Sequence, residues 1–227
     1  MRKKTFYTEL AYILGIVSLA IGASLMEKAN LGMSMVVAPA YVIYLKLSKV
    51  LDFVTFGMAE YSLQAILLII MVIVLRKFKI SYLFSFVTAI IYGFTLDGCM
   101  ALIAHINASD FVLRIVFYTI GILFCSSGVA FIFHTYIAPE VYELFVKEVS
   151  AKTNININRF KTRYDCVSCL IGILLSFIFF GFLHFEGVKL GTVICALING
   201  RLIGFISKQM EKHLNFTDLL PLKKYFI

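Results

Sequence analysis

Two charged residues lie inside apolar stretches of this sequence, where a charge is costly and therefore points to chemistry. Asp97 falls late in the third apolar run and Arg201 falls within the sixth. An acid and a base on two packed helices would form either a buried ion pair or a site for a charged solute or ion. Arg201 has a second interpretation, because a long basic side chain can extend along its helix to the polar surface.

Further polar residues lie near the starts of apolar segments. Glu60 and Asp165 begin the second and fifth runs, where each would cap its own helix or take part in gating. Ser34 and Glu140 open two shorter segments, and the free N–H groups of such helix starts attract anions. Glu140 would repel an anion, so a cation or a zwitterion is an equally good ligand. The predicted substrate or ion site comprises Asp97, Arg201, Asn199, Ser34 and Glu140.

No arrangement of side chains in the sequence is typical of an enzyme. The chain contains no H-E-x-x-H, G-x-S-x-G, P-loop or G-x-G-x-x-G motif. Cys166 and Cys169 form one C-x-x-C, but neither a second such pair nor a His pair accompanies it. We interpret them as small apolar residues on one helix face. The sequence therefore predicts no catalytic residue, no cofactor and no metal site.

The composition indicates what kind of protein must position these residues. Of 227 residues, 61% are hydrophobic and only 15% are charged, whereas a soluble domain has about 25% charged residues. The mean hydropathy of +0.92 is typical of membrane proteins and excludes disorder. Basic loops on one side of a membrane explain the net charge of +8, so nucleic acid is not predicted as a partner.

Six apolar runs have the length of about 20 residues that a membrane-spanning helix needs. Two shorter segments, Leu31–Leu47 and Ala138–Ala151, contain a proline or several charges, which favours interfacial or re-entrant helices. We expect residues 1–227 to form one all-helical membrane domain, a transmembrane bundle in a lipid bilayer. The predicted spans are Thr8–Met26, Gly57–Leu75, Ser81–Ala104, Phe111–Phe133, Tyr164–Leu183 and Val188–Ile206.

Basic residues are distributed unequally between the two sets of loops. With six spans, 15 of the 21 Lys and Arg residues fall on the side of the N-terminus and 5 on the other, while Arg201 lies inside a span. An excess of Lys and Arg is typical of cytoplasmic loops. The sequence therefore predicts a multi-pass protein whose N-terminus and C-terminal tail, 207–227, both lie in the cytoplasm.

The sequence contains an internal repeat with an offset of 105 to 107 residues between its two halves, about 8–104 and about 111–206. Each half holds three spans and one short helix. An odd number of spans inserts the second half upside down, as in the inverted repeats of many secondary transporters. We expect the repeated glycines to allow close helix packing. Corresponding residues are Gly22 and Gly128, Glu60 and Asp165, and Gly93 and Gly200.

These segments resemble the YczE/YyaS/YitT-like family of bacterial integral membrane proteins, over essentially the whole chain. The turn after the first helix of that family is similar to Ala29-Asn30-Leu31-Gly32, and Gly191-Thr192 matches the motif that opens its last helix. A Pro-Arg-Asp turn of the second half stands here as Pro139-Glu140, without the Arg. Asp97 matches the Asp that the family has late in its third span. Arg163 with Asp165 resembles the pair of an Arg and an acidic residue that precedes the fifth span of the family. The resemblance implies the same fold and a bacterial cell membrane location; transport is often supposed for the family, which is largely uncharacterised.

Three functions are compatible with the sequence. The first is a secondary transporter or channel that moves a small solute or ion by alternating access. The second is a non-transporting accessory protein that docks a cytoplasmic protein partner through the basic, amphipathic segment Ala138–Arg163. The third is the substrate-binding subunit of a larger transporter. A homo-oligomer is compatible with each of them.

Overall fold

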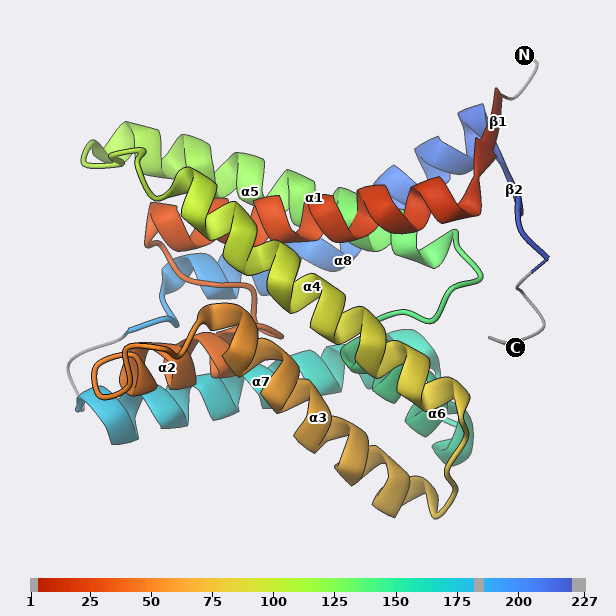
Figure 1. The fold of residues 1–227 in the computed structure, drawn as a ribbon, viewed down its shortest axis with the longest axis horizontal. Coiled ribbons are helices and arrows are strands. Elements are labelled where there is room, and N and C mark those ends of the chain that lie inside the picture. Colours follow the sequence, from red (N-terminus) through yellow and green to blue (C-terminus); the bar gives the residue numbers. More distant parts are fainter. Residues whose placement is uncertain (1–3, 182–185, 222–227) are drawn as a thin grey trace.

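The protein is an all-helical bundle in a computed structural model that describes residues 4–181 and 186–221 (Figure 1). Six of its helices are long and apolar enough to cross a membrane, so the predicted class of polytopic helical membrane protein is confirmed. These are α1 (Thr8–Ala29), α3 (Phe56–Leu75), α4 (Ser81–Ile103), α5 (Phe111–Phe133), α7 (Ile157–Phe180) and α8 (Leu190–His213). The short helices are α2 (Ala38–Leu47) and α6 (Val141–Thr153).

The last two spans differ most from the predicted elements. Helix α7 begins at Ile157, seven residues before the predicted start, because its basic first turns are helical although they are not apolar. The predicted end of that span, Leu183, lies outside the described residues. Helix α8 continues through Lys208 and Lys212 to His213, so the first part of the predicted tail is helical. Residues 222–227 of that tail lie outside the described residues.

Two short strands, which the sequence did not predict, join the ends of the chain (Figure 1). Strand β1 (Lys4–Tyr7) pairs in parallel with β2 (Leu214–Thr217). The His134 ring at the end of α5 stacks on Phe216 of β2, with ring centroids 4.3 Å apart. The strands therefore fasten the start of α1 and the end of α8 to the end of α5. We call this the N-terminal end of the bundle.

Helices α1 and α5 pack against each other along their length through glycines. A Cβ atom added to Gly22 would lie 2.7 Å from the carbonyl oxygen of Gly121, and one added to Gly128 would lie 2.7 Å from that of Gly15. The two helices run antiparallel, because the earlier glycine of each faces the later glycine of the other. An inverted repeat would place its two first helices in this way.

Helix α2 enters the bundle from the end opposite the N-terminus. Near its C-terminus, the Lys46 ammonium donates to the Phe179 carbonyl at the end of α7. The loop before α2 lies deeper, because the Ser168 hydroxyl of α7 donates to the Met35 carbonyl at 3.0 Å. Phe179 and Ser168 are 11 residues apart in α7, or roughly 16 Å along the helix. The start of α2 therefore lies deep in the bundle.

Helix α6 enters from the N-terminal end in the same manner. Near its C-terminus, the Lys152 ammonium donates to the Val74 carbonyl at the end of α3. At its start, the Val141 N–H donates to the Gln64 side chain, roughly 15 Å further along α3. The N-termini of both short helices are therefore directed toward the middle of the bundle, which favours the re-entrant over the interfacial interpretation.

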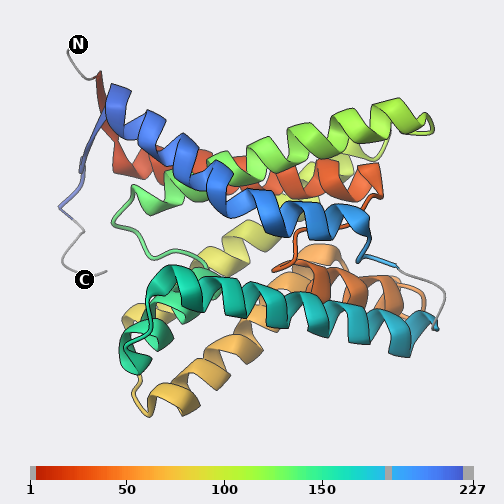
Figure 2. The same ribbon diagram turned by 180° about the vertical axis from the view of Figure 1, so that it is seen from behind.

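The two halves differ in how their last two spans pack. Helix α3 lies against α4, and an added Cβ at Gly93 would lie 2.9 Å from the Gly57 carbonyl oxygen. Helix α7 hardly touches α8, which follows α5 on the far side of the molecule (Figure 2). Gly200, which corresponds to Gly93, has no atom within 4 Å of an added Cβ.

Candidate functional site

A cavity of about 80 Å³, which we call the central cavity, lies between helices α1, α5 and α8 on one side and helices α6 and α7 on the other. It has room for a few water molecules or a small ligand. Helices α1, α5 and α8 supply a largely apolar wall that includes Met26, Val129 and Ile203. Helices α6 and α7 supply a charged wall of Glu140, Glu143, Lys161 and Asp165.

Gln64 of α3 holds the start of α6 at this cavity. Its Nε2 donates to Glu140 Oε2 at 3.1 Å, and its Oε1 accepts the Val141 N–H at 3.0 Å. A free N–H at a helix start would attract an anion, but this N–H is occupied by the protein itself. Tyr142 adds a second link between the two helices, because its hydroxyl donates to Glu60 Oε2 at 2.8 Å.

The charged wall contains more acid than base. The Lys161 ammonium lies 2.7 Å from Glu143 Oε1 and 3.9 Å from Asp165 Oδ1, so its hydrogen bond goes to Glu143. Asp165 is 9% exposed, and its Oδ1 accepts no hydrogen bond. Glu60, behind Tyr142, is fully buried and its Oε1 also lacks a partner. Two buried carboxylate oxygens beside one cavity therefore accept no hydrogen bond.

Ser34 and Asn199, which were both assigned to the predicted substrate site, line the central cavity. The Ser34 carbonyl accepts the N–H groups of Val37 and Ala38 in the turn that leads into α2. The Asn199 Oδ1 accepts a hydrogen bond of 2.8 Å from the Ser126 hydroxyl of α5. Three of the five residues predicted for the substrate site, Ser34, Glu140 and Asn199, therefore meet at one cavity.

Asp97 and Arg201 do not meet, so the predicted buried pair is wrong. The Asp97 carboxylate lies at the start of α3, where it accepts hydrogen bonds from the Thr55 hydroxyl at 2.6 Å and the Gly57 N–H at 2.8 Å. Arg201 lies on the exposed face of α8. It follows Asn199 by two residues, or roughly 200° of rotation, so it points away from the cavity when Asn199 points inward.

Glu60 and Asp165 do not cap their own helices. Thr55 caps α3 by accepting the Met58 N–H at 3.2 Å. Asp165 lies more than two turns inside α7, because that helix begins at Ile157. The capping interpretation is therefore wrong for both residues, and both carboxylates lie near the central cavity instead. A gating role for them stays a prediction.

The four glycines named for helix packing divide into two groups. Gly22 and Gly128 lie in the α1–α5 contact, and Gly93 lies in the α3–α4 contact. Gly200 lies in no contact, because α7 is not packed on that face of α8.

Sequence reasoning missed Gln64, Tyr142, Glu143 and Lys161. Gln64 follows Glu60 by four residues in an otherwise apolar span, and this spacing places both side chains on one helix face. Lys161 likewise precedes Asp165 by four residues, but it fell outside the predicted span. No signal marked Tyr142 and Glu143, because their positions depend on the insertion of α6.

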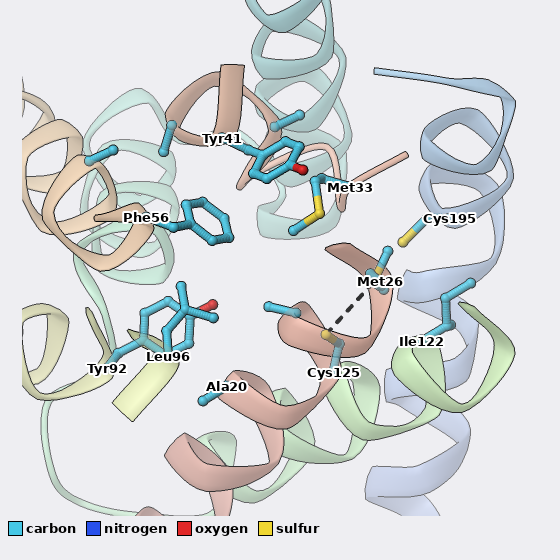
Figure 3. Close-up of a cluster of buried hydrophobic side chains, with 14 of the residues drawn as sticks. Ala20, Met26, Met33, Tyr41, Phe56, Tyr92, Leu96, Ile122, Cys125 and Cys195 are labelled. Carbon is cyan, nitrogen blue, oxygen red and sulfur yellow. Dashed lines mark hydrogen bonds between the residues drawn. The ribbon is translucent and has the colours of Figure 1, made fainter. Parts of the chain in front are cut away.

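A second, open cavity of about 560 Å³ lies at the end of the bundle opposite the N-terminal end. It is bounded by Glu27, Lys28, Tyr41 and Glu186 among others. We call it the vestibule. A constriction that shares residues with both cavities is lined by Met26, Met33 and Tyr41 among others, and Figure 3 shows these three side chains within the buried core. The Tyr41 hydroxyl donates to Glu27 Oε1 across a long 3.4 Å. These side chains therefore lie between the two spaces.

The apolar stripe of α6 is used inside the protein. Val141, Leu144 and Val149 are buried with Leu68, Met71, Tyr82 and Ala89 of α3 and α4. This stripe is therefore not available to dock a partner. In residues 4–181 and 186–221, no group of three His, Cys, Asp or Glu side chains is arranged to hold a metal ion.

Comparison with known proteins places the chain in a family. No curated protein and no solved structure matches it. A family model described as a family of unknown function, DUF6198, matches residues 6–208. The match includes both halves and every residue that lines the central cavity. The chain belongs to the DUF6198 family.

Proposed function

We propose that this protein is a membrane transporter that passes a small solute through the central cavity by alternating access. The observation that carries the proposal is the cavity itself, which lies where two re-entrant helices from opposite ends direct their N-termini. Secondary transporters of inverted-repeat design bind their substrates at such a midpoint. The internal symmetry and the mixed apolar and charged walls favour solute binding over a purely structural core.

The vestibule supports a path to one side. It shares Tyr41, Glu27 and Asn30 with the constriction, which in turn shares Met26 and Met33 with the central cavity. Methionine side chains change rotamer at low cost because they are unbranched. Rotation of these few side chains would connect the vestibule with the cavity without a change in the helices.

The unequal packing of the two halves supports the motion. The α3–α4 contact is closed at Gly57 and Gly93, while the corresponding face of α8 presents Gly200 and Gly204 to open space. If the halves exchange these two arrangements, α7 closes onto α8 as α3 separates from α4. That exchange would move access from one end of the cavity to the other.

The other sequence-based functions have less support. The accessory hypothesis uses the basic, amphipathic segment Ala138–Arg163 as a docking surface, and the apolar stripe of that segment is buried inside the protein. No observation favours a subunit of a larger transporter. The cytoplasmic position of both termini, the bacterial cell membrane location and the relationship to the YczE/YyaS/YitT-like family stay predictions.

Solute counterflow in proteoliposomes tests the proposal. Purified protein is reconstituted, loaded with unlabelled cationic, zwitterionic or anionic solutes of a few heavy atoms, and diluted into the labelled solute. We expect one class to accumulate above protein-free vesicles. Absence of accumulation for all three classes, with folded protein in the vesicles, would overturn the transport function.

A pair of glycine variants tests the motion. Gly200→Leu fills the face of α8 onto which α7 is proposed to close, while Gly98→Leu adds the same side chain to an exposed position of α4. Neither added Cβ meets an atom within 4 Å, so both proteins are expected to fold. Counterflow should be lost in the first and kept in the second. Equal counterflow in both would contradict closure at this face.

A further inference from the structure

The central cavity has two chemically different walls, and this division indicates what it binds. The wall of α1, α5 and α8 includes Leu19, Ala23, Val129, Ile132 and Ile203. The wall of α6 and α7 holds three carboxylates and a single ammonium group. A ligand that matches both walls has a hydrocarbon part and a charged part.

The sign of that charge follows from the pairing of the wall residues. Lys161 is engaged by Glu143 at 2.7 Å, so this pair is neutral and satisfied. Asp165 lines the cavity, is 9% exposed and has one oxygen with no hydrogen bond. An unpaired buried carboxylate oxygen is costly, and a cationic donor removes that cost.

Two neighbouring acids add to the negative field at Asp165. Glu140 lines the same cavity and accepts only the uncharged amide of Gln64. Glu60 is fully buried behind Tyr142, and one of its oxygens has no partner. An anion would meet these carboxylates, and the first N–H of α6, that of Val141, already donates to Gln64.

An organic cation fits this cavity better than a metal ion. Hard metal ions take six or more oxygen ligands, and much of the lining of this cavity is hydrocarbon. No set of three metal-ligating His, Cys, Asp or Glu groups occurs in the part of the chain that the structure describes. Tyr92 and Tyr142 also line the cavity, and tyrosine rings can attract ammonium groups.

We propose that the central cavity binds a small alkylammonium ion, with the nitrogen at Asp165 and the hydrocarbon against α1, α5 and α8. This inference names the substrate class and rests on the transport function proposed above. The nitrogen donates to the unpaired Asp165 oxygen. Glu140 and Glu60 stabilise the charge at longer range, while the apolar wall excludes water from the pair.

Thermal unfolding of the full-length protein in detergent tests the inference without any variant. The ligands are n-butylammonium, butan-1-ol and butanoate, which share a hydrocarbon chain and differ in charge, with sodium chloride at equal ionic strength. Butylammonium at about a hundredfold excess over its Kd should raise the unfolding midpoint by roughly 5 °C or more. The other three should not. Equal shifts with butan-1-ol or with sodium chloride would overturn the proposal.

Variants assign the binding to the acid. Asp165→Asn keeps the shape of the side chain and removes its charge, so butylammonium affinity should fall roughly tenfold to a hundredfold. Asp52→Asn, at an exposed loop position, is the matched control and should bind as the wild type does. Unchanged affinity in folded Asp165→Asn would contradict the site. If that variant does not fold, Glu140→Gln serves in its place, and the ligand series still decides.

Counterflow of labelled butylammonium separates this inference from the transport function. Binding at Asp165 without counterflow would support the site and contradict transport. Counterflow of a zwitterion or an anion, with no binding of butylammonium and no competition by it, would support transport and overturn the alkylammonium site.

Discussion

Gly57 of α3 and Gly93 of α4 pack backbone against backbone, and a Cβ at Gly93 would lie 2.9 Å from the Gly57 carbonyl oxygen. Asp97, one turn further along α4, accepts the Gly57 N–H at 2.8 Å. The two glycines and the acid thus join the last two spans of the first half. The second half lacks this joint, because Gly200 and Gly204 of α8 face open space.

The first prediction compares equivalent glycines. Gly93→Leu would force α4 away from α3, and overpacking of this kind costs about 1–3 kcal/mol. Gly200→Leu should leave the unfolding midpoint near that of the wild type, because no atom lies within 4 Å of the added Cβ. Chemical or thermal unfolding in detergent measures both. A comparable loss in the two variants would show that α7 already rests on α8.

The second prediction concerns Asp97, which the structure places at a helix start and away from the cavity. Asp97→Ala should destabilise the protein by about 1.5–3 kcal/mol through loss of its hydrogen bonds with the Thr55 hydroxyl and the Gly57 N–H, and it should leave butylammonium affinity unchanged. Asp110→Ala is the control, because Asp110 precedes α5 without making a side-chain capping bond. Reduced affinity with unchanged stability would instead return Asp97 to the substrate site.

The third prediction concerns Gln64, which binds both Glu140 and the Val141 N–H. Gln64→Leu leaves a buried carboxylate and a buried N–H without partners, at about 1–3 kcal/mol for each. The loss should appear as a lower unfolding midpoint and as faster amide exchange at the start of α6. Ser62→Ala, an exposed change on the same helix, should have neither effect. Normal protection of Val141 in Gln64→Leu would exclude this role.

The fourth prediction is a gain in butylammonium affinity rather than a loss. Lys161 lies 3.9 Å from Asp165 Oδ1 and competes with a cationic ligand for it. The double variant Glu143→Gln with Lys161→Met removes both partners of the shorter ion pair, so Glu143 is not left as a buried charge without its lysine, and Asp165 becomes the acid that a cation must neutralise. Butylammonium affinity should rise severalfold in calorimetric titration. A fall in affinity would mean that Glu143, rather than Asp165, receives the ligand.

The fifth prediction concerns pH and the outer end of α6. Burial raises the pKa of Glu148, but hydrogen bonds from Tyr82 and Lys79 outweigh burial and hold the pKa below its usual 4.5. A lowered folded-state pKa adds stability above the unfolded value, and that stability is lost as the pH falls through the folded value. Glu148→Gln should therefore unfold more easily than the wild type above about pH 5 and approach it near pH 3. A constant difference across that range would contradict the assignment.

Much of the fold follows from the sequence alone. The six spans, the two short helices between them and the order of these elements were predicted from hydropathy, because burying about 20 apolar residues in lipid is decided locally along the chain. Five of the six spans begin within about two residues of their predicted starts. Ser34, Glu140 and Asn199 were also assigned to one site, since their positions in the repeat place them near the midpoint.

Only the tertiary structure decided which charges meet. Asp97 and Arg201 both stand out in a hydropathy profile, yet Asp97 binds the start of α3 and Arg201 faces outward, because the rotation of each helix is set by its packing partners. Gln64, Glu143 and Lys161 enter the site because α6 is inserted between the spans, and no local pattern encodes its depth. The sequence by itself determined six apolar segments of membrane-spanning length, and it predicts that they form two matched halves. The positions of α6 and α7 determined that one wall of the central cavity is acidic and that Asp165 Oδ1 lies there without a hydrogen bond.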